Sequence, residues 1–125
     1  MNRRRIRSPH VVVVLVTCAS MREARRVADA LVTQRAAACV NCVPNIRSVF
    51  RWQGRVDHAS ETLLIIKTLA SRVAAVRRIV RRLHSYDVPE ILALPIRQGH
   101  PPYLAWVAAS VRPPAARSRR RHAVV

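Results

Sequence analysis

Three side chains near the ends of predicted elements could together bind a metal ion. Glu90 follows Pro89 at the start of an apolar run, and His84 and Asp87 precede it. Pro89 removes a backbone donor and biases the preceding residue away from helical geometry, so the chain must leave a helix here. Cys18 ends the first apolar run of the chain. A thiolate, an imidazole and a carboxylate would form a site of mixed softness, suited to copper or zinc.

Each of these residues also has a purely structural interpretation. Cys18 could be a buried thiol, and His84 could be favoured at a helix C-terminus by the macrodipole. Glu90 could be an exposed acid at a turn. The strand ends that carry these residues converge only if the sheet order brings them together. The residues alone therefore leave both interpretations open.

The sequence carries few groups that could perform catalysis. Its two glycines, Gly54 and Gly99, cannot form a phosphate-binding glycine loop. It contains no nucleophile elbow and no H-E-x-x-H motif, and only six carboxylate side chains. We therefore predict a protein that is not an enzyme and has no catalytic residues.

Apolar runs and helical periodicities predict the elements that position these residues. A valine-rich run over 11–17 suits a strand buried on both faces. Ser20 and Glu23 form a capping-box pattern at the start of a helix that ends near residue 35. The other predicted elements are an extended region over 38–52, a return strand over 62–68, a helix over 71–84, a strand over 90–96 and a last helix from residue 101. This β-α-β-β-α-β order with an extra C-terminal helix predicts an α+β, ferredoxin-like sandwich.

The extended region and the return strand predict a long central hairpin. Pro44 and Asn45 predict a bulge or bend, and Gly54 predicts the turn because it can adopt positive φ. The arms are longer than the usual ~5–6 residues of a strand, so one small sheet rarely covers them. We therefore expect Phe50 and Trp52, near the far end, to be buried against another subunit.

The chain is strongly basic, with a formal net charge of +17 and a single lysine, Lys67, among 23 basic residues. Residues 1–9 and 113–125 contain arginine and no acid, and we predict that they are disordered basic tails on one domain over 10–112. Such tails attract nucleic acid at low salt, so we expect nucleic-acid binding to be non-specific at most. Codon usage that favours arginine over lysine is the alternative explanation.

The first apolar run and the cysteines predict a cytoplasmic protein without a membrane partner. The run from 11 to 16 is shorter than the ~7–15 residues of a secretory signal and the roughly 20 needed to span a bilayer. Cys39 and Cys42 lie in an extended region, where residues three apart point to opposite faces. Their Cα atoms would be about 10 Å apart, beyond the ~7 Å limit for a disulfide. We interpret both as buried structural thiols.

Six segments, in combination and in this order, resemble the CutA divalent-cation tolerance family. They cover the chain between the two arginine tails: Val11–Thr17, Ala36–Asn41, Phe50–Gly54, Glu61–Thr68, Leu83–Glu90 and Gly99–Trp106. The resemblance implies a ferredoxin-like homotrimer whose long hairpins pair across subunits. It also implies a function in tolerance of copper and other divalent cations, with binding of copper or another divalent cation. We expect this binding to be weak, because two family ligand positions are not kept in this sequence.

The resemblance also identifies candidate ligands position by position. The family's metal-associated carboxylate matches Glu90, and its helix-end histidine matches His84. Two further family ligand positions hold Val16 and Leu83, which cannot coordinate a metal. Cys18 lies two residues after Val16, on the same side of a strand, where it could substitute.

An alternative function follows from the architecture that the CutA family shares with the trimeric PII signalling proteins. A trimer of this kind could sense a small molecule or a partner in the clefts between subunits, although no nucleotide-binding loop is evident here. The residues expected to line these clefts are Tyr86, Asp87, Lys67 and Tyr103.

Overall fold

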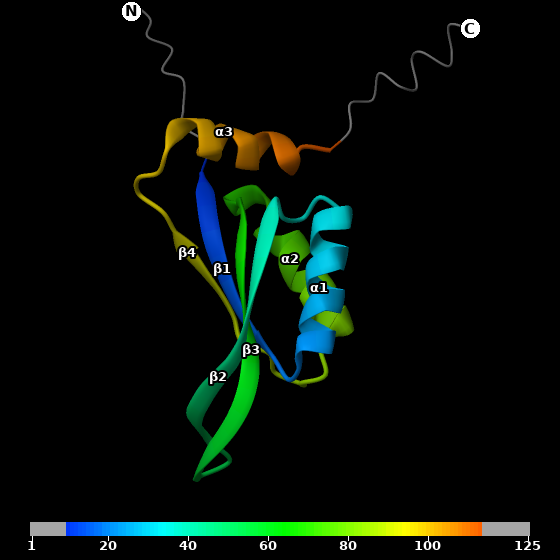
Figure 1. Cartoon of the computed structure of the whole chain (residues 1–125), viewed down its shortest axis with the longest axis vertical. Coiled ribbons are helices and arrows are strands. Elements are labelled where there is room, and N and C mark those ends of the chain that lie inside the picture. Colours follow the sequence, from blue (N-terminus) through cyan, green and yellow to red (C-terminus); the bar gives the residue numbers. More distant parts are fainter. Residues whose placement is uncertain (1–9, 114–125) are drawn as a thin grey trace, which may run out of the picture.

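The computed structural model describes residues 10–113, so the predicted tails, except for residue 113, lie outside the described residues. Figure 1 shows the predicted element order, β-α-β-β-α-β with an added C-terminal helix. The elements are β1 (Val11–Cys18), α1 (Met21–Thr33), β2 (Cys39–Trp52), β3 (Arg55–Leu69), the 3-10 helix η1 (Ala70–Arg72), α2 (Val73–Leu83), β4 (Ile91–Pro95) and α3 (Pro101–Ser110). The ferredoxin-like α+β prediction is confirmed.

The four strands form one antiparallel sheet in the order β2-β3-β1-β4. β1 is central, and its residue Val14 pairs with Ile66 on one side and Ala93 on the other. At the end of β1, Val16 pairs with Ile91, the first residue of β4. The sheet order therefore brings the end of β1 beside the start of β4.

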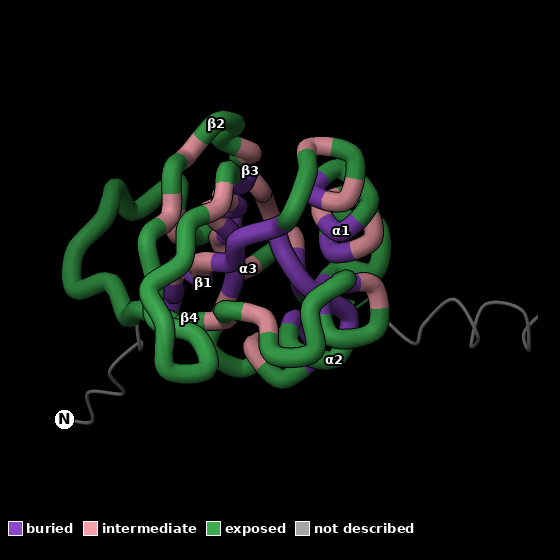
Figure 2. Tube along the Cα trace, turned by 90° about the horizontal axis from the view of Figure 1, so that it is seen from below, coloured by how far each residue is buried: buried purple, intermediate pink, exposed green. Residues whose placement is uncertain are grey.

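The core lies between the sheet and helices α1 and α2, which cover one of its faces (Figures 1 and 2). Alternate residues of β1 face these helices, as the two-residue period of a strand requires. The core residues of the helices recur every three or four positions, which forms one apolar stripe on each helix. The fully buried members include Val14, Val16, Cys18, Ala24, Val27, Leu31, Leu64, Ile66, Val76 and Val80.

The other face of the sheet is open at its centre. Val13 and Leu15 point away from α1 and α2, and pair with Leu94 and Leu92, which are both exposed. Helix α3 lies across one end of the sheet and buries Val107 (Figure 1). None of the helices over residues 10–113 has the length and apolar character needed to cross a bilayer.

The central hairpin has the predicted bulge and turn. The pairing of β2 with β3 shifts register between Val43 and Ile46, where Asn45 has a φ of 59°. Gln53 and Gly54 both have positive φ in the turn, 49° and 79°, as a two-residue type I′ connection requires. The predicted start of the return strand at residue 62 was wrong, because β3 begins at residue 55. Backbone pairing continues to the turn even where the side chains are polar.

The three cysteines are free thiols. Cys18 is buried, whereas Cys39 and Cys42 are half-buried, so the prediction that both of the latter are buried was wrong. The reason is the sheet order, since β2 is an edge strand and only β3 covers it from the side.

Candidate functional site

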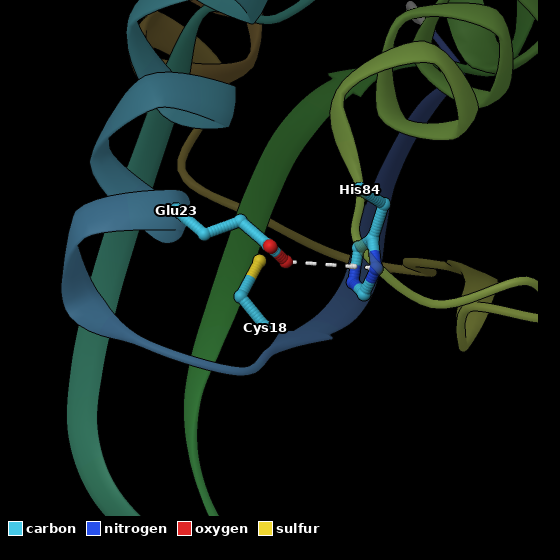
Figure 3. Close-up of side chains that lie close together, drawn as sticks. All are labelled: Cys18, Glu23 and His84. Carbon is cyan, nitrogen blue, oxygen red and sulfur yellow. Dashed lines mark ion pairs between the residues drawn. The ribbon is translucent and has the colours of Figure 1, made fainter.

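A thiol, a carboxylate and an imidazole meet where the end of β1 lies below the two helices (Figure 3). Cys18 ends β1, Glu23 lies in the first turn of α1, and His84 caps the C-terminus of α2. Their potential ligand atoms lie within 4.8 Å of one another. We call these three residues the buried cluster. It combines the donor types that soft and borderline metal ions prefer.

Local structure sets the position of each member of the buried cluster. The Glu23 N–H donates to Ser20 Oγ at 3.1 Å, which confirms Ser20 as the predicted N-cap. The predicted return contact from the Glu23 carboxylate to the cap is replaced, because its Oε2 lies 3.5 Å from His84 Nδ1. The His84 N–H donates to Val80 O and so continues the α2 ladder by one residue.

Two hydrogen bonds define the protonation of the His84 ring. The backbone N–H of Tyr86 donates to His84 Nδ1 at 3.1 Å, so Nδ1 carries a lone pair. The opposite nitrogen, Nε2, is 2.7 Å from the carbonyl oxygen of Thr17 and therefore carries the proton that it donates. The ring is thus oriented with Nε2 on the Thr17 carbonyl and with Nδ1 toward both the Tyr86 N–H and the carboxylate of Glu23.

Burial dominates the electrostatics of the cluster. Burial is the larger cause and the negative charge of Glu23 a smaller one, and together they raise the pKa of the Cys18 thiol to about 12. Glu23 Oε2 is buried and has no hydrogen-bond partner among the described residues. A buried acceptor without a partner is costly. A cation or a shared proton at this position would lower that cost.

Glu90 does not join the buried cluster. It is exposed and lines a hollow of about 340 Å³ together with Thr17, Ser48, Val49, Phe50 and Glu61. Glu61 is only 8% exposed, and the Tyr86 hydroxyl donates to its Oε2 at 2.7 Å. Burial, together with this bond to Glu61, raises the pKa of Tyr86 to about 12. The hollow therefore offers two carboxylates, one exposed and one held by a tyrosine.

The four predicted cleft residues lie in two separate places within one subunit. Tyr86 and Asp87 line a cleft of about 350 Å³ with Phe50 and Trp52, between the hairpin and the loop before β4. Lys67 and Tyr103 belong to the other end of the sheet. The Lys67 ammonium donates to Asn41 Oδ1. Tyr103 contacts Cys39, and Cys39 pairs with Lys67 across β2 and β3. Burial raises the pKa of Tyr103, and the neighbouring Cys39 adds to this rise.

Comparison with known proteins assigns the chain to a family. The profile of the family described as CutA1 divalent ion tolerance protein matches residues 12–110. The chain belongs to the CutA1 family. This match covers every described strand and helix apart from the first residue of β1.

Relatives and solved structures agree with the family assignment. The chain is 48% identical over 95 residues to the divalent-cation tolerance protein CutA of Thermus thermophilus, covering 76% of this chain and 92% of that protein. It is also 48% identical over 92 residues to mouse protein CutA, covering 74% of this chain but 52% of that protein. It therefore spans about half the length of some of the mammalian relatives it matches.

The solved structures show that the CutA1 fold is shared. The Thermus thermophilus Cut A1 structure superposes with a TM-score of 0.79 at 46% identity, covering 80% of this chain and 97% of that chain. CutA1 from Oryza sativa superposes with a TM-score of 0.81 at 43% identity, covering 84% and 96%. None of the matched proteins named here is described as a PII protein, so nothing in them favours the PII-like alternative.

Sequence reasoning missed two acids of this region. The capping pattern at Ser20 explains Glu23 only as part of a helix cap, and the predicted return strand over 62–68 does not include Glu61. The signal for Glu23 was available, since an acid in the first turn of a helix can also face the C-terminus of a neighbouring antiparallel helix. No comparable signal marked Glu61, because its burial depends on Tyr86, 25 residues away in the chain.

Proposed function

We propose that this CutA1 chain contributes to tolerance of copper or another divalent cation by binding the ion at the buried cluster of Cys18, Glu23 and His84. The observation that carries the proposal is the approach of three donor atoms to within 4.8 Å, one of them a buried carboxylate oxygen without a partner. Thiolate, imidazole and carboxylate donors suit copper and zinc. The ion is the cargo of the protein and requires no catalytic step, so we propose a non-enzymatic function.

The orientation of His84 supports this assignment. A histidine that ligates a metal usually donates its second ring N–H to a carbonyl or carboxylate, which fixes the tautomer. Here Thr17 O accepts the Nε2 proton, and Nδ1 keeps its lone pair toward Glu23. The N–H of Tyr86 occupies that lone pair at 3.1 Å. Cation binding therefore requires the loop at Tyr86 to move slightly, which limits the affinity.

The raised pKa of Cys18 predicts that cation binding releases a proton. The thiol is protonated below about pH 12 in the free protein, whereas a metal ligand must be the thiolate. Below that pH, the cation must displace the thiol proton, and each unit of increasing pH makes this displacement ten times more favourable. The cation affinity should therefore rise up to tenfold per pH unit. Calorimetry of Cu²⁺ binding in buffers with different ionisation enthalpies measures the released proton directly.

An isosteric pair of substitutions tests which carboxylate holds the cation. We expect Glu23→Gln to weaken Cu²⁺ binding by at least about tenfold, because it removes the anionic donor from a buried site. Glu90→Gln should leave the affinity within about twofold. The opposite result would move the site to the hollow that Glu90 shares with Glu61, as the family resemblance predicts. Equal isotherms for both variants and wild type would refute cation binding at either acid.

A second measurement tests whether the Cys18 thiolate is a ligand of the cation. Co²⁺ bound to a thiolate gives a charge-transfer band, which we expect to disappear in Cys18→Ser. The half-buried thiols provide the matched control, because Cys39→Ser and Cys42→Ser should retain the band. Loss of the band only in one of these control variants would place the cation on β2 instead.

We further propose that three copies assemble as a homotrimer through the open face of the sheet and the hairpin end. Val49, Phe50 and Trp52 are exposed near that end, and Leu92 and Leu94 are exposed on the open face. Large exposed apolar areas of this kind mark interaction surfaces. The clefts predicted to contain Tyr86, Asp87, Lys67 and Tyr103 would then combine residues of neighbouring subunits.

The cytoplasmic location is likewise a proposal. Among the matched proteins, a CutA from Arabidopsis thaliana is named as chloroplastic and a CutA from Archaeoglobus fulgidus as periplasmic. Cell fractionation of the host, with an antibody against the chain, measures the location; recovery with a membrane or extracytoplasmic fraction would contradict it.

A further inference from the structure

Helix α2 exposes four arginines on the side that faces away from the sheet. Arg77, Arg78, Arg81 and Arg82, which we call the arginine quartet, are all exposed. Their spacing of i, i+1, i+4 and i+5 places them as two pairs, one helical turn apart on one side of the helix. The buried side consists of Ala75, Val76, Ile79 and Val80.

The quartet is not explained by contacts within the subunit. Over residues 10–113, no carboxylate oxygen lies within 4.0 Å of any of its guanidinium groups. Like charges one turn apart destabilise a helix. The helix macrodipole favours Arg81 and Arg82 in the last turn, but the effect does not reach Arg77 and Arg78. The isolated subunit therefore leaves two pairs of arginines unneutralised.

A surface depression lies beside the quartet. Its volume is about 680 Å³, within the usual ~300–1,000 Å³ of ligand pockets. The quartet forms one wall, and the loop that joins α2 to β4 forms the other, with Ser85, Tyr86 and Pro89. Four guanidinium groups make the lining cationic, whereas pockets for neutral ligands are mostly apolar. The depression is therefore suited to a small anion with several charges.

We propose that this depression binds an oligophosphate, a small molecule with two or more phosphates in series. Each guanidinium offers a planar set of donors that matches a phosphate in bidentate geometry. The two arginine pairs are about 6 Å apart along the helix, four residues at ~1.5 Å each. A single phosphate could contact one pair, whereas linked phosphates can contact both. This site adjoins the proposed cation site, because His84 lines the depression and also belongs to the buried cluster. The proposal does not require a bound cation, and its test is made without divalent cations.

The arginine wall of the depression stays accessible in the proposed trimer, whereas Tyr86 and Asp87 of the other wall also line the cleft with Phe50 and Trp52. That assembly uses the open face of the sheet and the hairpin, whereas α2 lies on the opposite face (Figure 1).

Asp87 lies at the edge of the depression, where its negative charge repels an anion. We therefore expect Asp87→Asn to tighten oligophosphate binding by about twofold. A loss of binding in Asp87→Asn would contradict an anion placed beside this loop.

Calorimetric titration of the full chain with tripolyphosphate, at about 0.15 M salt and without divalent cations, tests the proposal. Under these conditions distant surface charges are screened. We expect the Arg78→Ala/Arg82→Ala double variant to bind at least about tenfold more weakly than wild type. The control double variant Arg22→Ala/Arg26→Ala removes the same charge, from α1, where neither residue lines the depression. It should bind within about twofold of wild type.

The outcomes separate the proposal from general attraction to a basic chain. Equal weakening by both double variants, or no saturable binding by wild type, would overturn it. Adenosine triphosphate and tripolyphosphate serve as parallel ligands: similar affinities point to free oligophosphate, and tighter binding of the nucleotide points to a nucleotide. Quartet-dependent binding of a single-stranded oligonucleotide alone, without binding of either small anion, would replace the proposal with a nucleic-acid surface.

Discussion

The two halves of the β2–β3 hairpin have the same backbone pairing but different surroundings. In the half nearest the sheet centre, Leu64 and Ile66 are fully buried beneath α1 and α2. Beyond the bulge at Pro44 and Asn45, the hairpin extends past the helices (Figure 1), and Val49 is 65% exposed. The comparison shows that strand pairing alone does not bury a hairpin, because burial requires a second layer of structure.

The outer half of the hairpin lacks a covering layer of helices within the described residues 10–113. A two-stranded ribbon without a covering layer is marginal in water. Trp52 is 50% exposed in the single chain, although it is one of the largest apolar side chains available. In the proposed trimer, the neighbouring copy would provide the missing layer.

The largest effect is expected for a substitution in the inner half. Ile66→Ala removes a fully buried side chain and leaves a cavity, so the free energy of unfolding should fall by about 2–5 kcal/mol. Urea denaturation measures the change. The control is Val56→Ala in the outer half, which in a single subunit should cost less than about 0.5 kcal/mol. Equal costs would show that both halves are buried alike.

A second prediction concerns assembly through the outer half. Trp52→Ala should weaken trimer formation by at least about 2 kcal/mol, roughly 30-fold, because a central aromatic contact is lost. Phe50→Ala should also weaken trimer formation. Sedimentation velocity measures the effect of both substitutions. Val32→Ala provides the control, since Val32 is exposed on α1, away from the proposed interface. A chain that is monomeric at micromolar concentration before any substitution would refute the trimer.

The smallest effect is expected at the turn of the outer half. Gly54 has a φ of 79°, and a Cβ added there would meet no atom within 4 Å. The cost of Gly54→Ala is therefore backbone strain alone, about 1 kcal/mol. Gln53→Gly, which relieves a residue already at positive φ, should be neutral or slightly stabilising. Hydrogen exchange of the outer amides measures both, and unchanged protection in Gly54→Ala would contradict the strained turn.

The local features of this chain were the ones that the residues predicted well. The bulge at Pro44-Asn45, the turn at Gly54 and the N-cap at Ser20 depend on residues a few positions apart, and all three are confirmed. The start of β3 was not predicted, because polar residues from 55 to 61 hide a strand whose pairing is made by the backbone. Cys39 is only half-buried because β2 lies at the edge of the sheet. The amino-acid composition of β2 does not reveal that edge position.

The sequence by itself determined the order of strands and helices, because periodicity, caps and turns are set by neighbouring residues. It also determined that Cys18 and His84 end their elements. Only the tertiary structure decided which acid meets them, and it is Glu23 rather than Glu90. The physical reason is that α1 packs beside α2 over β1, which brings the first turn of one helix to the end of the other. Contacts of this kind are made between elements, and no local pattern encodes them.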